Sequence, residues 1–162
     1  MSDILSKLKK NSKVNYTSVL SESEFFSSNK EQVTTPVPMV NVALSGSLDG
    51  GLTSGMTLIA GPSKHFKTSF ALLMASAYLD KYADAALLFY DTEFGSPQSY
   101  FESFGIDTDR VIHTPVTNIE ELKFDIMGQL ESLTSSDKVV IVIDSIGNIA
   151  SKKEVEDALN EK

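Results

Sequence analysis

The 162-residue sequence contains no cysteine and no tryptophan, and none of its apolar runs is long enough to cross a bilayer. The absence of cysteine excludes disulfides, and His65 and His113 lack neighbours at the spacing of a zinc site. Basic residues are scarce: 14 Lys and Arg against 22 Asp and Glu give a net charge of −8, which repels phosphate backbones overall. Because the first ten residues are too polar for a secretory signal, we expect a protein of the cytoplasm with no membrane partner.

The first 35 residues differ in composition from the rest of the chain. They are rich in Ser, Asn, Lys and Glu, with apolar residues at helical spacing, and the prolines of residues 34–38 favour an extended linker. This pattern predicts a helical arm over residues 1–35 and a main domain over residues 36–162. Phe25 and Phe26 could dock on a neighbouring subunit or pack against the arm itself, and both interpretations remain open.

Strand-like and helix-like segments alternate after residue 39. Alternation of this kind predicts an α/β fold in which helices cover both faces of a mostly parallel sheet. The expected strands are residues 56–60, 85–90, 111–113 and 138–143, and the expected helices are residues 67–82, 97–104 and 119–133.

Residues 61–68 lie between an expected strand and an expected helix, as in a phosphate-binding loop. Such a loop needs backbone amides that converge on phosphate oxygens, a lysine for the β/γ-phosphates and a hydroxyl for Mg²⁺, which Lys67 and Thr68 supply. Phe66 stands where the usual motif has glycine, so an ordinary strand-turn-helix with a surface lysine is the alternative. The candidate ATP-binding residues are Gly61, Pro62, Ser63, Lys64, His65, Phe66, Lys67, Thr68 and Ser69.

Three carboxylates follow the ends of expected strands. Asp144 ends a β-branched run that predicts a buried parallel strand, and beside the loop it could hold a water on Mg²⁺, or simply cap the next turn. Glu93 follows another strand and is our candidate for orienting the attacking water. For Asp91, an acceptor role within the turn is favoured over catalysis.

Several segments resemble the UvsX-like recombinases of T-even-type bacteriophages, which are members of the RecA family. The resemblance extends over the whole chain and includes the unusual Phe66. It implies that Glu93 is the catalytic glutamate, that Asp144 belongs to the second acidic motif, and that Tyr100 stacks on adenine. Pro97 occupies the place of an acid that the family usually has before that tyrosine. The segments that carry the resemblance are residues 38–46, 60–67, 88–91, 110–116 and 150–162.

The resemblance also implies a function: an ATP- and Mg²⁺-dependent DNA recombinase that acts in homologous recombination, recombination-dependent replication and repair. Such a protein would form a homo-oligomeric filament through its N-terminal arm. It would bind single-stranded DNA through loops that the family carries beyond the residues present here, so we expect this chain to be a truncated RecA-like ATPase core. The alternatives are a fragment of a RecA-fold helicase-type motor, or a non-catalytic module that binds nucleotide or caps a filament.

Overall fold

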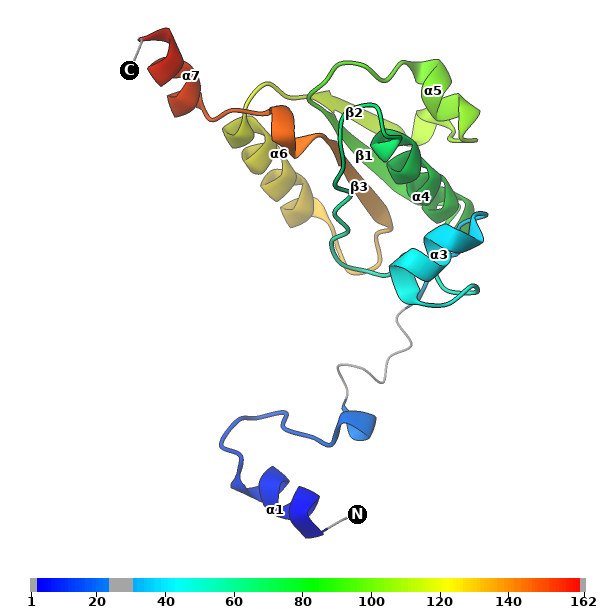
Figure 1. Ribbon diagram of the computed structural model, residues 1–162, viewed down its shortest axis with the longest axis vertical. Helices are drawn as coiled ribbons and strands as arrows, with labels where there is room; N and C mark the ends of the chain where they lie inside the picture. Colours follow the sequence, from blue (N-terminus) through cyan, green and yellow to red (C-terminus); the bar gives the residue numbers. More distant parts are fainter. Residues whose placement is uncertain (1–2, 24–30, 161–162) are drawn as a thin grey trace.

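A computed structural model describes residues 3–23 and 31–160. Its centre is a parallel sheet of three strands, in the order β2-β1-β3 (Figure 1). The strands are β1 (Ala86–Asp91), β2 (Val111–Pro115) and β3 (Val139–Asp144). In the register of the sheet, Asp91 lies between Pro115 and Asp144. The carboxyl ends of all three strands therefore meet at one edge, where polar side chains were expected to gather.

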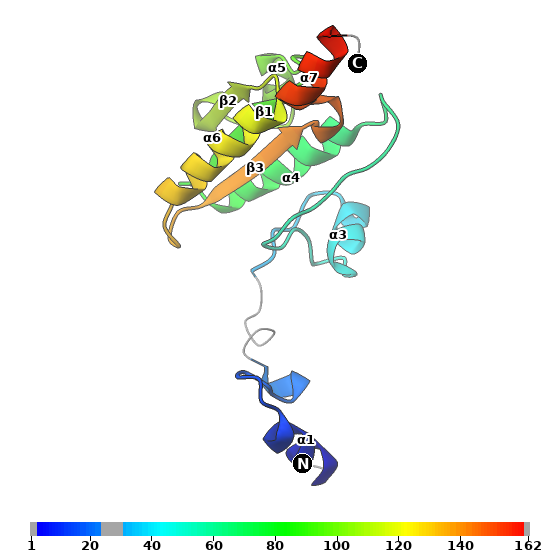
Figure 2. The ribbon, with the colours of Figure 1, turned by 90° about the vertical axis from the view of Figure 1, so that its left-hand side faces the viewer.

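Helices cover both faces of this sheet, which makes three layers (Figures 1 and 2). On one face, α4 (Lys67–Lys81) and α5 (Gln98–Ser103) pack against Leu87 and Phe89. On the other face, α6 (Ile119–Ser132) packs against Leu88 and Tyr90. Successive residues of a strand point to opposite faces, so an apolar strand of this kind is buried from both sides. The α/β class and these six elements were predicted from the sequence, and they are confirmed.

The described residues form three further α-helices: α1 (Asp3–Asn11), α3 (Pro38–Ser45) and α7 (Lys152–Leu159). Within the arm predicted to be helical, α1 forms a helix, whereas α3 was not expected. Proline fits the first position of a helix, where its missing N–H has no partner to lose, so Pro38 begins α3 instead of ending a linker. Within residues 3–23 and 31–160, no helix is long and apolar enough to cross a membrane. Three short 3-10 turns complete the structure: η1 (Leu20–Glu22), η2 (Thr108–Arg110) and η3 (Ile146–Asn148).

A buried asparagine organises the segment around α3. The side chain of Asn41 accepts hydrogen bonds from the backbone N–H and the hydroxyl of Thr35, both at 2.8 Å, and donates to the Thr35 carbonyl at 2.9 Å. Nearby, Val33 pairs with Leu52 in an antiparallel bridge. Residues just before position 36 thus pack against those that follow, and the division into an arm and a core stays a prediction. The pair Phe25 and Phe26 lies outside the described residues.

The expected strand at residues 56–60 does not form. This segment is coil, and Met56 and Leu58 are 96% and 79% exposed. A strand needs a partner for its backbone N–H and C=O groups, and no strand of the described part pairs with these residues. For a related reason β3 is half-buried rather than buried, since among the described strands it pairs only with β1.

Candidate nucleotide-binding site

The loop at residues 61–66 leads directly into α4. Its residues Lys64 and Phe66 adopt left-handed backbone conformations, with φ of 63° and 57°, and Phe66 is the N-cap of the helix. Glycine is the residue that normally adopts this conformation without steric cost. Phe66 thus adopts, where the usual motif has glycine, a backbone conformation that glycine favours.

Thr68 and Asp144 are in direct contact. The Thr68 hydroxyl donates a hydrogen bond of 2.6 Å to Asp144 Oδ2, although the two residues are 76 positions apart in the sequence. The contact joins the first turn of α4 to the end of β3. Hydroxyl and carboxylate oxygens are ligands that Mg²⁺ prefers, so the structure brings together the two residues predicted to serve the metal.

Lys67 is turned back onto its own loop. Its ammonium group donates a hydrogen bond of 2.9 Å to the carbonyl of Pro62. The ring of His65 likewise stays local, with Nδ1 at 2.9 Å from the carbonyl of Ser63. The Lys67 ammonium group thus already lies over the loop whose amides would hold a phosphate, and its present partner is a neutral carbonyl that an anion could replace.

Thr92 joins the ends of β1 and β3. Its N–H donates to the Asp144 carbonyl at 2.9 Å, its hydroxyl donates to the Ser145 carbonyl at 2.8 Å, and it accepts from the Ser145 N–H at 2.8 Å. The Asp144–Ser145 peptide bond is cis. Thr92 was not among the residues predicted from the sequence. The one feature that could have indicated its role is a hydroxyl group directly after a strand.

Asp91 shapes the turn after β1. Its Oδ1 accepts hydrogen bonds from the N–H groups of Glu93 and Phe94, at 3.0 and 2.7 Å, and its carboxylate is almost completely buried. Oδ2 lies 3.2 Å from Nε2 of His113 on β2. The predicted turn role is confirmed, and His113, which the sequence did not single out as a partner, completes the environment of the carboxylate.

Glu93 projects from this turn toward the segment after β3. Its Oε1 accepts hydrogen bonds from the Asn148 side-chain amide at 2.7 Å and from the Ser145 hydroxyl at 3.1 Å. Neither donor was identified from the sequence, because both lie in a short turn whose path depends on the packing of two other strands.

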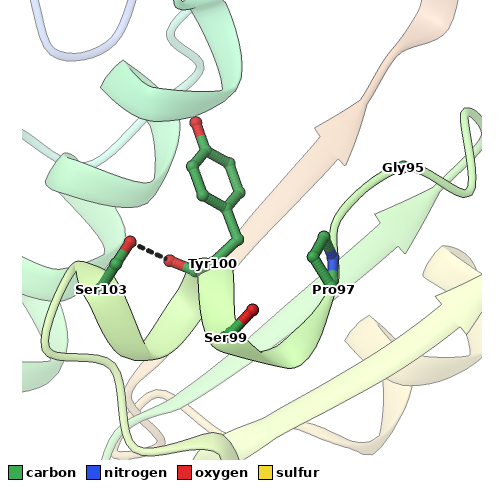
Figure 3. A pocket seen from close by; sticks show the side chains of 5 residues that line it. All are labelled: Gly95, Pro97, Ser99, Tyr100 and Ser103. Carbon is green, nitrogen blue, oxygen red and sulfur yellow. Dashed lines mark hydrogen bonds between the residues drawn. The ribbon is translucent and has the colours of Figure 1, made fainter.

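Tyr100 lies on α5, close to the start of α4. Its hydroxyl is 2.6 Å from the hydroxyl of Ser69, and its ring meets Phe104 edge-on. Figure 3 shows the ring rising from α5, and the dashed line marks the hydrogen bond of 2.6 Å from the Ser103 hydroxyl to the Tyr100 carbonyl. An open hollow of about 380 Å³ adjoins it, lined by Gly95, Pro97, Ser99, Tyr100 and Ser103. Tyr100 connects this hollow to the first turn of α4 through its contact with Ser69.

The oxygens of Thr68 and Asp144 suit a metal whose other ligands come from water and a bound substrate. In the part of the chain that the structure describes, no three His, Cys, Asp or Glu side chains are grouped closely enough to hold an ion. Thr68 and Asp144 therefore offer only part of a coordination shell. Mg²⁺ usually keeps several waters and is bound through one or two protein groups and substrate phosphates, so the residues present fit Mg²⁺ that arrives with a nucleotide.

The chain is 52% identical, over all of its 162 residues, to the "Recombination and repair protein" of Enterobacteria phage T4. It spans 41% of the length of that relative. No family model matches the chain. The sequence is thus homologous to part of a phage recombination and repair protein.

Proposed function

We propose that this chain is the nucleotide-binding part of an ATP-dependent DNA recombinase of the RecA and UvsX type. The observation that carries the proposal is the 2.6 Å contact between Thr68 and Asp144, which joins the start of α4 to the end of β3. An ordinary strand-turn-helix with a surface lysine requires no such contact. A site for Mg²⁺ and phosphate requires these two oxygens to lie together.

Each residue then has a task in ATP hydrolysis. Lys67 and the loop amides neutralise charge on the β- and γ-phosphates. The N-terminus of α4, which follows the loop, adds the favourable field of a helix dipole. Thr68 would hold Mg²⁺ directly and Asp144 through water, and the bound ion would supply positive charge opposite the phosphate oxygens. Glu93 orients the attacking water. Tyr100 stacks on the base beside its hollow.

The recombination role rests on the similarity to the T4 protein, whose name states recombination and repair. That similarity favours a recombinase over a helicase-type motor, and a three-layer parallel sheet is compatible with a RecA-like core. We propose that the whole protein is a DNA-dependent ATPase that forms filaments on single-stranded DNA and promotes homologous pairing and strand exchange.

The metal dependence of ATP binding tests the site. Thr68→Ala removes the hydroxyl that would bind the metal, so the affinity for ATP with Mg²⁺ should fall by roughly tenfold or more, whereas the affinity measured in EDTA should hardly change. Ser132→Ala, at an exposed hydroxyl that bonds only within α6, serves as the control. Equal Mg²⁺ dependence in the Thr68→Ala chain and the wild type would contradict the assignment.

One outcome would favour the non-catalytic alternative. If the chain binds Mg²⁺-ATP through Lys67 and Thr68 but shows no turnover even in single-turnover assays with excess protein, a nucleotide-binding or filament-capping module becomes the better description.

A further inference from the structure

We propose that Asn148 is a positioning residue for Glu93. The inference rests on the proposed function, because it gives Asn148 a task in the hydrolysis that Glu93 would promote. Asn148 is the last residue of η3, in the turn that follows β3, whereas Glu93 follows β1. The two side chains meet through the 2.7 Å hydrogen bond from the Asn148 amide to Glu93 Oε1.

The contact leaves one oxygen of the carboxylate available. Asn148 and Ser145 both donate to Oε1, and within residues 3–23 and 31–160 no group donates to Oε2. Both donors are neutral, so they set the direction of the carboxylate without pairing its charge as lysine or arginine would. A carboxylate that must accept a hydrogen bond from water needs this combination of a fixed orientation and a free, charged oxygen.

Asn148 restricts the rotation of the Glu93 side chain, which the backbone contacts of the turn leave free. The turn that carries Glu93 is already held by Asp91, which accepts from the Glu93 N–H at 3.0 Å. The side chain beyond it still has three rotatable bonds, and ordering them costs conformational entropy. The Asn148 amide fixes its far end, so the carboxylate is held at both the backbone and the tip.

The Asn148 side chain does not stabilise its own turn through a hydrogen bond in the described structure. Across the described residues its amide makes no hydrogen bond other than the one to Glu93. Its backbone is anchored on both sides: before it, the Ser145 N–H bonds to the Thr92 hydroxyl, and after it, Ala150 pairs with Asn118 at the start of α6. The turn therefore supplies a fixed base from which a short amide can direct Glu93.

Steady-state kinetics and ATP binding test the role together. Asn148→Ala should lower kcat for ATP hydrolysis by about tenfold, within the range of effects seen when a reacting group is misplaced. Asn148→Asp should lower it further by repelling Glu93. In both variants the Kd for Mg²⁺-ATP should stay within about twofold of the wild type. Asn160→Ala, whose side-chain hydrogen bond in the described structure goes to Glu156 of its own helix, is the matched control.

The Glu93→Ala background separates positioning from general damage. If Asn148 acts through Glu93, Asn148→Ala should cause no further loss of turnover once that carboxylate is absent. A loss of the same size in both backgrounds would overturn the proposal, as would a wild-type kcat in Asn148→Ala. Either of these two results would contradict the role of Asn148 without contradicting the proposed ATPase function.

A readout without nucleotide tests the contact itself. In amide NMR spectra, the side-chain NH₂ signals of Asn148 should move in Glu93→Ala and stay in place in Glu131→Ala, a change of another exposed glutamate. Unmoved signals would overturn the proposal directly. Moved signals in a chain that neither binds nor hydrolyses ATP would instead overturn the proposed function, and the positioning role would fall with it.

Discussion

Asp91 and Glu93 are two residues apart, but their carboxylates have different surroundings. Asp91 is buried and accepts two backbone N–H groups of the turn, whereas Glu93 is exposed and keeps one oxygen free of protein donors in the described structure. A group that orients water must reach the water, so the geometry favours Glu93 for hydrolysis and Asp91 for the shape of the turn.

Glu93→Gln should therefore reduce ATP turnover by roughly 100-fold or more with little change in ATP affinity, because the charge is lost and the shape is kept. Asp91→Asn should reduce turnover less and should instead lower the stability of the fold by about 1–2 kcal/mol, since a charged acceptor of two N–H groups becomes neutral. Turnover and chemical denaturation of both variants check this. A reversed order of the two turnover effects would make Asp91 the base.

For individual residues, residue type and position after a strand were enough to select Asp91, Glu93 and Asp144 as candidates, but not to identify their hydrogen-bond partners. The contacts of Glu93 with Asn148 and of Asp91 with His113 cross between strands. Such pairings depend on the order and register of the sheet, which no local pattern in the sequence encodes.

Arg110, the only arginine of the chain, ties several elements together. Its guanidinium donates to the carbonyls of Leu79, Tyr82 and Ala85, at distances from 2.6 to 3.1 Å. It thus satisfies carbonyls at the end of α4 and in the turn that leads to β1, where helix carbonyls have no partner of their own.

Replacing this group should destabilise the fold. Arg110→Met keeps much of the apolar stem but leaves three carbonyls without a charged donor, so we expect a loss of about 2–4 kcal/mol in the free energy of unfolding. Lys123→Met, at an exposed position on α6, should change it by less than about 0.5 kcal/mol. Urea denaturation of the two variants compares them, and equal stability would contradict the role of Arg110.

Tyr90 links β1 to α6 through a hydrogen bond of 2.6 Å from its hydroxyl to Asp125 Oδ2. Burial, and secondly the bond to Asp125, raise the pKa of the Tyr90 phenol above its ordinary value. In the unfolded chain the phenol ionises near pH ~10, so the stability it contributes is complete below that pH and is lost as the pH rises through the folded-state pKa.

The wild type should therefore lose more stability than Tyr90→Phe when the pH is raised from about 9 to 11. Denaturation curves at the two pH values measure the difference, with Tyr16→Phe, at a largely exposed tyrosine, as the control. Parallel pH dependence in the wild type and Tyr90→Phe would show that this phenol does not contribute.

Elements with a strong local pattern were predicted well. The apolar runs of β1 and β3 and the alternating helices α4, α5 and α6 formed close to their expected bounds. Residues 56–60 have an equally apolar pattern but lack a strand beside them, so local sequence was not enough. The prediction of an extended linker up to Pro38 was wrong at that residue, because proline also suits the first turn of a helix and Pro38 begins α3.

The whole molecule carries a net charge of −8, which opposes binding to nucleic acids. Four of its 13 lysines form a local cluster within residues 7–13. Of these, α1 carries Lys7, Lys9 and Lys10, and Lys9 is paired with Glu22 at 3.4 Å. Among the described residues, Lys81 and Lys138 lie over the ring of Tyr82 and cover it, whereas binding of a single strand needs an open aromatic face beside basic side chains.

We accordingly expect the 162-residue chain not to bind single-stranded DNA by itself, even though the proposed whole protein does. Fluorescence anisotropy with a labelled poly-thymidine strand at low salt, where phosphate contacts are strongest, is the most demanding test. Saturable binding that weakens with added salt would contradict this expectation and would direct attention to the lysines of α1 and to Lys13.

The central claim is that residues 61–68, with Asp144, form a site for Mg²⁺-ATP. Calorimetric titration of the chain with Mg²⁺-ATP tests it most directly, comparing the wild type with Lys67→Ala and with Lys123→Ala as the control for a lost positive charge. We predict weak, saturable binding of one nucleotide, unchanged in Lys123→Ala and reduced in Lys67→Ala by about 100-fold or more, equivalent to roughly 3 kcal/mol for a charge-assisted contact to phosphate. Unchanged affinity in Lys67→Ala would contradict the claim.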